Sequence, residues 1–216
     1  VEWRERAAAE PPRRYRGQRY WARPLPGFGD PRAAIVVVGL APAAHGGNRT
    51  GRIFTGDRSG DWLFAALHRA GLANQPASEH ARDGLRLKNA YVTAVNRCPP
   101  PANRPTPEER DNCLPYLVRD LRLLARGRVL VPLGSFAWEN SLRALGELGA
   151  SIPRPRPRFG HGAELELRGD RGDGGGGRPW ALVGCFHPSQ QNTFTGKLTE
   201  PMMDAVFARA RELAEA

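Results

Sequence analysis

The sequence predicts an α/β fold, a three-layer α/β/α sandwich around a mainly parallel four-stranded sheet. Short apolar runs of strand length begin near residues 35, 90, 129 and 180. A helix-like segment or a loop follows each run, which is the order that parallel strands require. The length of 216 residues suits one domain over residues 1–216 that can bury a sizeable core.

Residues 1–31 are expected to form a basic N-terminal arm. Residues 1–10 have a helical composition, and Pro11 and Pro12 stop that helix. Residues 13–31 are rich in arginine, aromatic residues, proline and glycine. Arginine interleaved with aromatic residues suits a surface that follows phosphates. The same aromatic side chains can instead cover the core, and both interpretations stay open.

The first predicted strand leads into a glycine-rich loop. The run Ile35 to Val38 is apolar and β-branched, like a strand buried on both faces. Residues 39–57 are mainly small and polar, so their backbone N–H groups should lie at the carboxyl edge of the sheet, where open α/β folds bind ligands. The loop matches neither the GxxxxGK[ST] nor the GxGxxG nucleotide fingerprint.

Helix and strand signals alternate through the rest of the chain. The strongest is Thr106-Pro107-Glu108-Glu109, a capping box with proline at the first helical position. Residues 169–178 are glycine-rich and are expected to form a flexible insert. Helices are expected over residues 60–71, 106–126, 136–148 and 198–214, and further strands over 90–96, 129–133, 163–167 and 180–186.

The charge balance favours a polyanionic partner. Lys+Arg total 32 against 22 Asp+Glu, a formal net charge of +10, with an isoelectric point near 10.6. Nucleic acid is the leading candidate. Only Lys88 and Lys197 are lysines, so an arginine bias of the genome is an alternative cause. No apolar run reaches membrane-spanning length and no signal peptide is evident, so a soluble, cytoplasmic protein without a membrane partner is expected.

The three cysteines do not by themselves define a site. An odd number argues against a disulfide framework. Cys185 lies in an apolar run and is expected to be a buried hydrophobe. Cys98 and Cys113 alone are too few for a zinc or iron–sulfur centre, which needs about four ligands. From the residues alone, these two are free thiols.

Three polar segments follow predicted strands and should converge at one edge of the sheet. They are GLAPAAHGGNRTGRIFTGD (residues 39–57), NRCPPPANRPTPEE (residues 96–109) and HPSQQNTFTGKLT (residues 187–199). In this order and spacing they resemble the motifs of the family 5 (type B) uracil-DNA glycosylases, and the resemblance covers nearly the whole chain. It implies a monofunctional DNA glycosylase that removes uracil, and other deaminated or damaged bases, from DNA and leaves an abasic site.

The resemblance assigns roles to four side chains, each with a structural alternative. Phe54 would stack on a flipped base, or simply pack in the core. Asn103 would read the base edge or assist catalysis, or shape a turn. His187 would donate a hydrogen bond to the departing uracil anion, or be structural. Asp57 would orient water or stabilise the sugar cation, or cap the following helix.

Further contacts follow from the same motifs. Leu40 and Ala41 stand where sister families carry a polar residue that positions water, which suits a more permissive pocket. Ala41 and His45 are expected near the base, and the segment 190–195 resembles the loop that penetrates DNA. The residues expected to contact DNA are Asn48, Arg49, Gln190, Gln191 and Asn192.

The resemblance also implies a [4Fe-4S] cluster. Family members bind it through four cysteines, two of which match Cys98 and Cys113, while the other two are expected N-terminal of Val1. Such a cluster would staple the N-terminal helix to the rest of the fold. The expected partner is single- or double-stranded DNA, bound by a monomer. Two rival functions are a damaged-DNA binding protein that does not cut and, less favoured, an iron–sulfur redox protein.

Overall fold

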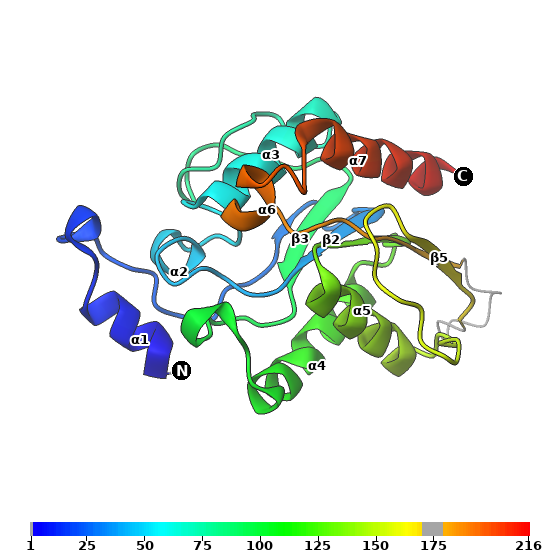
Figure 1. Ribbon diagram of the computed structural model, residues 1–216, viewed down its shortest axis with the longest axis horizontal. Coiled ribbons are helices and arrows are strands. Elements are labelled where there is room, and N and C mark those ends of the chain that lie inside the picture. Colours follow the sequence, from blue (N-terminus) through cyan, green and yellow to red (C-terminus); the bar gives the residue numbers. More distant parts are fainter. Residues whose placement is uncertain (1, 170–178) are drawn as a thin grey trace.

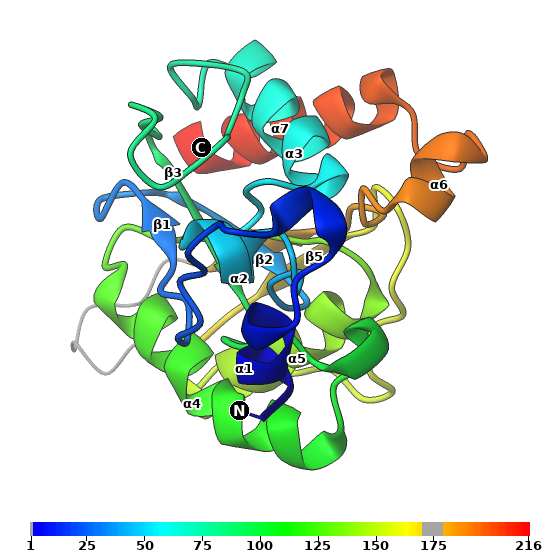
Figure 2. The same ribbon diagram turned by 90° about the vertical axis from the view of Figure 1, so that its left-hand side faces the viewer.

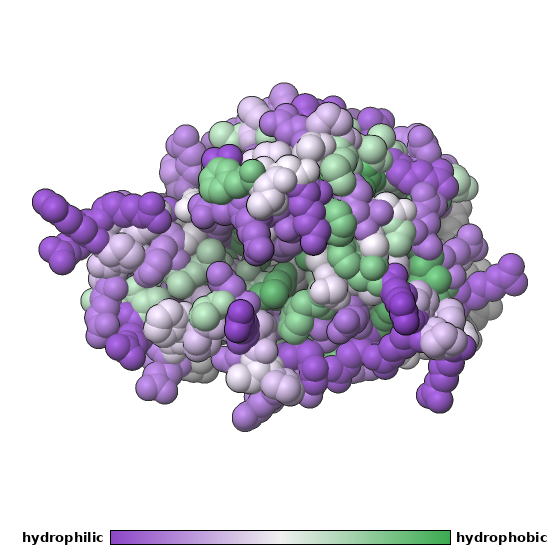
Figure 3. All heavy atoms as spheres, in the orientation of Figure 1, coloured by the Kyte–Doolittle hydropathy of each residue, from purple (hydrophilic) through white to green (hydrophobic). Residues whose placement is uncertain are grey.

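The computed structural model describes residues 2–169 and 179–216, and it confirms the three-layer α/β/α arrangement (Figure 1). Helices α3 (Arg58–Arg69) and α7 (Glu200–Glu215) cover one face of the sheet. Helices α4 (Pro107–Leu123) and α5 (Ser135–Glu147) cover the other. The space-filling view shows a mostly hydrophilic face with an apolar patch near its centre (Figure 3).

The sheet has six described strands in the order β1-β3-β2-β4-β6-β5. The four expected strands form its parallel centre, with bounds given below. The expected sheet of four strands was too small because an antiparallel strand joins each edge. One of these lies within the strand expected over residues 163–167, whereas the other, over residues 28–29, was not expected. The parallel strands are β2 (Ile35–Gly39), β3 (Ala90–Ala94), β4 (Val129–Pro132) and β6 (Trp180–Val183), and the edge strands are β1 (Phe28–Gly29) and β5 (Glu164–Leu167).

Strand alternation divides the core in two. On β2, Ile35 and Val37 belong to the cluster packed with α3 and α7, whereas Val36 and Val38 belong to the cluster packed with α4 and α5. All four side chains have no solvent exposure. This double burial explains why β2 is an unbroken apolar run instead of an alternating one.

The predicted helices form with small shifts at their ends. Thr106 makes the expected capping box, accepting from the Glu109 amide at 3.1 Å while Glu109 accepts from the Thr106 amide at 2.8 Å. Pro115 lies inside α4 without ending it. Short helices also form at α1 (Glu2–Ala9), η1 (Arg13–Tyr15), α2 (Gly47–Thr50), η2 (Pro101–Asn103) and α6 (Gln190–Phe194).

The N-terminal arm lies against the first loop, and part of it covers the core, as one of its two interpretations expected. The amide of Trp21 donates to the Arg49 carbonyl at 3.1 Å, and that of Ala22 donates to the Asn48 carbonyl at 3.2 Å. Tyr20 is buried, whereas the Trp21 side chain is 43% exposed. Figure 2 shows α1 and α2 on the side of the molecule that faces the viewer, with α6 farther to the right.

The predicted insert, residues 169–178, lies outside the described residues except for Gly169, which forms an isolated antiparallel bridge with Ala150. Within the described ranges, none of the helices combines the length and the apolar character that a membrane crossing requires.

Candidate functional site

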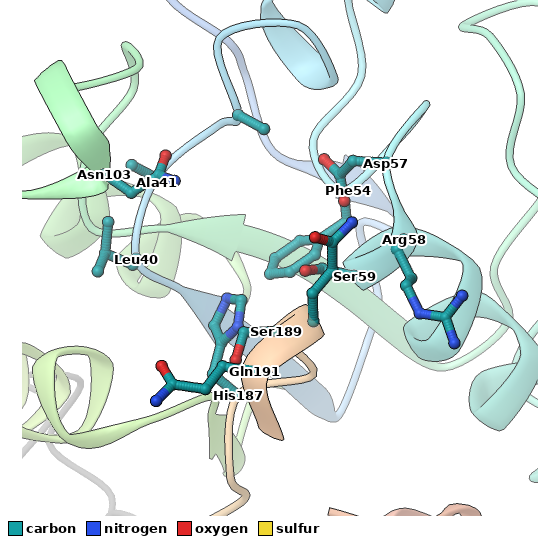
Figure 4. A pocket seen from close by; sticks show the side chains of 12 residues that line it. Leu40, Ala41, Phe54, Asp57, Arg58, Ser59, Asn103, His187, Ser189 and Gln191 are labelled. Atoms are coloured by element: carbon teal, nitrogen blue, oxygen red, sulfur yellow. The ribbon is translucent and has the colours of Figure 1, made fainter. Parts of the chain in front are cut away.

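A pocket of about 520 Å³ opens at the carboxyl ends of β2 and β6. Strand β3 lies on one side of β2, and the chain then crosses back to place β4 on the other side. The strand order therefore reverses at β2, and open α/β sheets bind ligands at the carboxyl edge of such a point. The pocket is lined by Leu40, Ala41, Ala43, Phe54, Asp57, Arg58, Ser59, Asn103, His187, Ser189, Gln190 and Gln191 (Figure 4).

Phe54 forms part of the core and part of the pocket wall at the same time. Its side chain is 6% exposed and packs in the cluster on the α3 side of the sheet. A Cβ atom on Gly39 would lie 2.5 Å from Cε2 of Phe54, so only glycine at the end of β2 lets the ring approach this closely. The Phe54 backbone has a positive φ of 53°, an uncommon conformation that marks a tightly determined position.

His187 faces Phe54 across the pocket. It follows β6, and its ring centroid lies 5.9 Å from that of Phe54 with 33° between the planes (Figure 4). Burial lowers the pKa of His187 to about 4. The imidazole is therefore neutral at pH 7, where it can donate one hydrogen bond without carrying a charge.

Asp57 caps α3, as one interpretation of the sequence expected. Its Oδ1 accepts from the Gly60 amide at 3.1 Å. Burial raises the pKa of the Asp57 carboxyl, while hydrogen bonds from the Gly60 and Ser59 amides oppose that rise. The same side chain also lines the pocket, so the capping role and the pocket position of Asp57 are compatible.

Asn103 lies on the opposite wall, beside Ala41 (Figure 4). It ends η2, the short helix that follows the proline-rich turn, and both it and Ala102 have positive φ values, 54° and 51°. Asparagine tolerates this left-handed conformation better than most residues. The turn chemistry and the pocket position of Asn103 are thus compatible.

The segment after His187 serves the pocket in two ways. Gln190 and Gln191, at the start of α6, line it directly. Asn192 instead turns back, and its Nδ2 donates to the His187 carbonyl at 2.8 Å. Ser189 caps α6 by accepting from the Asn192 amide. Asn192 therefore braces the backbone of His187 and is not among the residues that line the pocket.

His45 and Arg49 lie apart from this pocket. His45 lines a neighbouring hollow of about 500 Å³ that shares Asp57 and Asn103 with the pocket. The His45 Nδ1 lies 3.0 Å from the hydroxyl of Tyr20, and burial lowers the pKa of this imidazole. Arg49 donates to the carbonyls of His45 and Gly56, so it holds the loop together.

Asn48 was expected to contact DNA, and the structure contradicts that expectation. Its side chain has no solvent exposure. The Nδ2 group donates to the carbonyls of Arg4 and Ala44, at 3.1 Å and 3.2 Å. Asn48 therefore joins α1 to the first loop instead of facing a ligand.

Several lining residues were not expected from the sequence. Ser59 and Arg58 directly follow Asp57, and their exposure to the pocket depends on where α3 begins. The side chain of Ala43 has no functional group that would indicate a pocket residue from the sequence. Ser189 carried the clearest signal, since serine before a polar helical segment is a common cap.

The comparison with known families agrees with this geometry. A family model described as the uracil DNA glycosylase superfamily matches residues 26–211. The chain belongs to the uracil-DNA glycosylase superfamily. The predicted resemblance is thereby confirmed.

The type-5 relatives in this superfamily match over most of their length. The type-5 uracil-DNA glycosylase of Mycobacterium tuberculosis is 53% identical over 215 residues, covering 99% of this chain and 75% of the relative. That of Thermus thermophilus is 46% identical over 214 residues, covering 99% and 90%. A type-4 uracil-DNA glycosylase of Archaeoglobus fulgidus is 40% identical over 114 residues, covering 52% and 49%. The likeness to type-5 members thus spans the pocket and both faces of the sheet.

The cysteines of this superfamily member do not complete a metal site by themselves. Within residues 2–169 and 179–216, no three His, Cys, Asp or Glu side chains are grouped so as to hold a metal ion. Cys98 and Cys113 are half-buried thiols, and burial raises the pKa of Cys113. Nη1 of Arg4 lies 3.2 Å from Sγ of Cys98, so α1 reaches this pair. The described residues thus provide two thiols, half of a four-cysteine set.

Proposed function

We propose that this protein is a monofunctional DNA glycosylase that hydrolyses the N-glycosidic bond of uracil in DNA and leaves an abasic site, the first step of base excision repair. The observation that carries the proposal is a neutral His187 facing Phe54 in one cavity that Asp57 also lines. Membership of the superfamily, and relatives named type-5 uracil-DNA glycosylases, support the same activity.

The base enters the pocket by leaving the DNA stack, because the glycosidic bond is otherwise out of reach. Phe54 offers an aromatic face for the base. The amide of Asn103 has both a donor and an acceptor, which the edge of uracil requires. Ala41 forms the adjacent wall. These contacts would hold the base while its bond to the sugar is stretched.

Bond cleavage leaves the bonding electron pair on the base and positive charge on the sugar. The neutral His187 would donate a hydrogen bond to the developing uracil anion, an effect of about 3 kcal/mol for one well-placed donor. The Asp57 carboxylate would orient the water that adds to C1′ and offset the charge of the sugar. That water would lose a proton, and the departing base would gain one. No lyase step is proposed, since neither Lys88 nor Lys197 lines the pocket.

The pocket favours a broader substrate range than uracil alone. Leu40 and Ala41 are apolar and line the wall where sister families carry a polar residue. Fewer polar contacts at this position impose fewer hydrogen-bond requirements on the base. Other deaminated or damaged bases are therefore proposed as substrates, with His45 and Arg49 supporting the loop beside them.

We also retain the proposed [4Fe-4S] cluster, with Cys98 and Cys113 as two ligands and two cysteines N-terminal of Val1 as the others. The contact of Arg4 with Cys98 supports a location between α1 and the proline-rich turn. A cluster there would contribute folding energy, and no catalytic step is assigned to it.

The proposed protein acts as a single domain and a monomer on single- or double-stranded DNA, in the cytoplasm where that DNA lies. Gln190 and Gln191 are placed to meet the DNA at the pocket mouth. Two rival functions can be distinguished from this one by experiment. A non-cutting damage-binding protein would bind uracil-DNA without needing Asp57 or His187, and a redox protein would need an electron partner.

The deciding experiment is single-turnover cleavage of a uracil-containing oligonucleotide by the wild type. Release of uracil with an abasic product would establish the activity, and cleavage of oligonucleotides carrying other deaminated bases would define its range. Binding of uracil-DNA without cleavage would replace the enzyme with the damage-binding protein. Absence of both would contradict the proposal.

A further inference from the structure

The segment Pro153 to Arg158 connects α5 to β5 and alternates proline with arginine. All three arginines, Arg154, Arg156 and Arg158, are exposed. Within the described part of the chain, none of them has a carboxylate partner at salt-bridge distance, in contrast to exposed Arg69 and Arg209. The segment therefore presents three charges that the rest of the described fold does not neutralise.

The backbone that carries these charges is held in place. Nε1 of Trp138 donates to the Pro157 carbonyl at 2.9 Å. The ring of Phe159 lies 6.2 Å from that of Trp138 and 6.0 Å from that of Phe186, both in edge-to-face arrangements. The prolines further restrict the chain by fixing φ. A ligand that binds the arginines would therefore order side chains only, at a small entropic cost.

The residues that directly follow the segment, Gly160 and His161, lie beside the strand end that delivers His187. The Phe186 amide donates to Nδ1 of His161 at 3.1 Å, and the two rings lie 5.0 Å apart. A Cβ atom on Gly184 would come within 2.3 Å of the Gly160 carbonyl oxygen, so the two backbones are in close contact. Figure 1 shows the yellow chain of this connection reaching the orange chain that leads to α6. The arginine segment is thus coupled to one rim of the pocket.

We propose that Arg154, Arg156 and Arg158 bind backbone phosphates of the DNA strand that flanks the target nucleotide. This proposal rests on the proposed function for its choice of DNA as the polyanion. Five residues span at most about 18 Å when extended, enough to meet up to three successive phosphates. Contacts of this kind position the duplex without reading its sequence.

Salt dependence of binding separates phosphate contacts from general charge. The test compares the wild type with a triple variant, Arg154→Ala, Arg156→Ala and Arg158→Ala. Each is titrated against a labelled duplex with an uncleavable abasic analogue between about 50 and 200 mM salt. Loss of three contacts should reduce the slope of log K against log salt by about 2.7 for this duplex.

Two matched variants complete the test. Replacing Arg119, Arg122 and Arg126 by alanine removes the same charge from exposed positions on and just after α4, and should leave the slope unchanged. Replacing the three segment arginines by lysine keeps the charge and should retain most of the slope. An equal reduction in both alanine variants, or none in either, would overturn the proposal. If the wild type binds the duplex but releases no uracil, the proposed activity fails while the slopes still decide the phosphate contacts.

Discussion

The backbone of Gly46 lies directly against the carboxylate of Asp57. A Cβ atom built on Gly46 would lie 2.3 Å from Oδ2 of Asp57, far inside contact distance. The φ of Gly46 is −97°, outside the left-handed region that favours glycine. Position 46 is restricted to glycine by the Asp57 carboxylate, which leaves no room for a Cβ atom. The position of the Asp57 carboxylate, the proposed water-orienting group, thus depends on the absence of a side chain at Gly46.

Gly46→Ala should therefore reduce uracil excision by about 100-fold, since a displacement of about 1 Å in a catalytic group has that order of effect. The measurement is the single-turnover rate. Gly146→Ala is the matched control, because its added Cβ meets only Ile152 at an ordinary 3.4 Å. Wild-type rates in Gly46→Ala would show that the carboxylate can move without consequence.

Asp57→Asn should lower activity and raise stability together. Burial raises the pKa of Asp57, so the folded state loses stability as pH rises from the unfolded value through the raised one. Asparagine removes that charge yet still caps a helix. We expect excision to fall by about 100-fold or more. The free energy of unfolding at pH 7, from urea titration, should be at least that of the wild type.

Asp61→Asn provides the comparison for this change. Asp61 also lies in the first turn of α3, and burial raises its pKa as well. Its substitution should leave excision within a few-fold of the wild type. If Asp57→Asn keeps full single-turnover cleavage, Asp57 is a helix cap and the water has another activator.

His187→Ala should slow excision by about 100- to 1,000-fold through loss of one donor to the leaving base. Binding of DNA with an uncleavable abasic analogue should change far less. His187→Gln keeps an N–H donor and should recover part of the rate. Equal rates in the alanine and glutamine variants would argue that the ring supports packing only.

The same histidine predicts a pH dependence of stability. Its pKa is about 4 in the fold against 6.5 ordinarily, so between these values the unfolded chain binds a proton that the folded chain excludes. Wild-type stability should fall as the pH drops from 6.5 toward 4. His187→Gln should remove that part of the fall, measured by urea midpoints at pH 7 and pH 5.

The buried pair Arg52 and Asp83 should control the conformation of the Phe54 loop. Arg52 donates to Asp83 Oδ1 at 2.9 Å and to Thr55 Oγ1 at 3.0 Å, and Thr55 directly follows Phe54. Asp83→Asn leaves a buried guanidinium without its counter-charge, which should cost about 3–5 kcal/mol of unfolding free energy. Asp204→Asn, in an exposed pair with Arg69, should cost about 1 kcal/mol or less.

Acid titration checks the same pair. Burial alone would raise the pKa of Asp83, but hydrogen bonds from Arg52 and from the Leu85 and Glu79 amides hold it below its ordinary value. The stability it contributes is present above the unfolded pKa and is lost as pH falls below that value. Asp83→Asn should flatten the acid limb below about pH 4, and an unchanged limb would contradict this assignment.

The parallel centre of the fold could be predicted because its signals are local. The apolar run Ile35 to Val38 and the capping box at Thr106 each identify an element from a few neighbouring residues. Strand β1 escaped prediction because Phe28 and Gly29 have no pattern of their own and pair only through β3. Helix α2 escaped because glycine-rich segments seldom favour helix, and tertiary contacts decide there.

The sequence predicts which residues form the candidate site better than it predicts how their side chains are oriented. Phe54, Asn103 and His187 follow strand ends, and the edge rule brings such residues together. Which way a side chain turns depends on partners elsewhere in the chain. Asn48 is buried by Arg4, and His45 is held by Tyr20, both from the N-terminal arm. No local pattern around residues 45–48 contains that information.

The order of strands has a consequence for how the chain is made. Strand β2 is the first long strand to be synthesised, yet Ile35 pairs with Ala90 on one side and Val129 on the other. Its neighbours leave the ribosome much later, and contacts between distant segments slow folding. The apolar run of β2 must therefore remain without its neighbouring strands while the rest of the chain is synthesised. Since His187 emerges long after Phe54, a stalled or truncated product would carry the stacking ring without the donor opposite it.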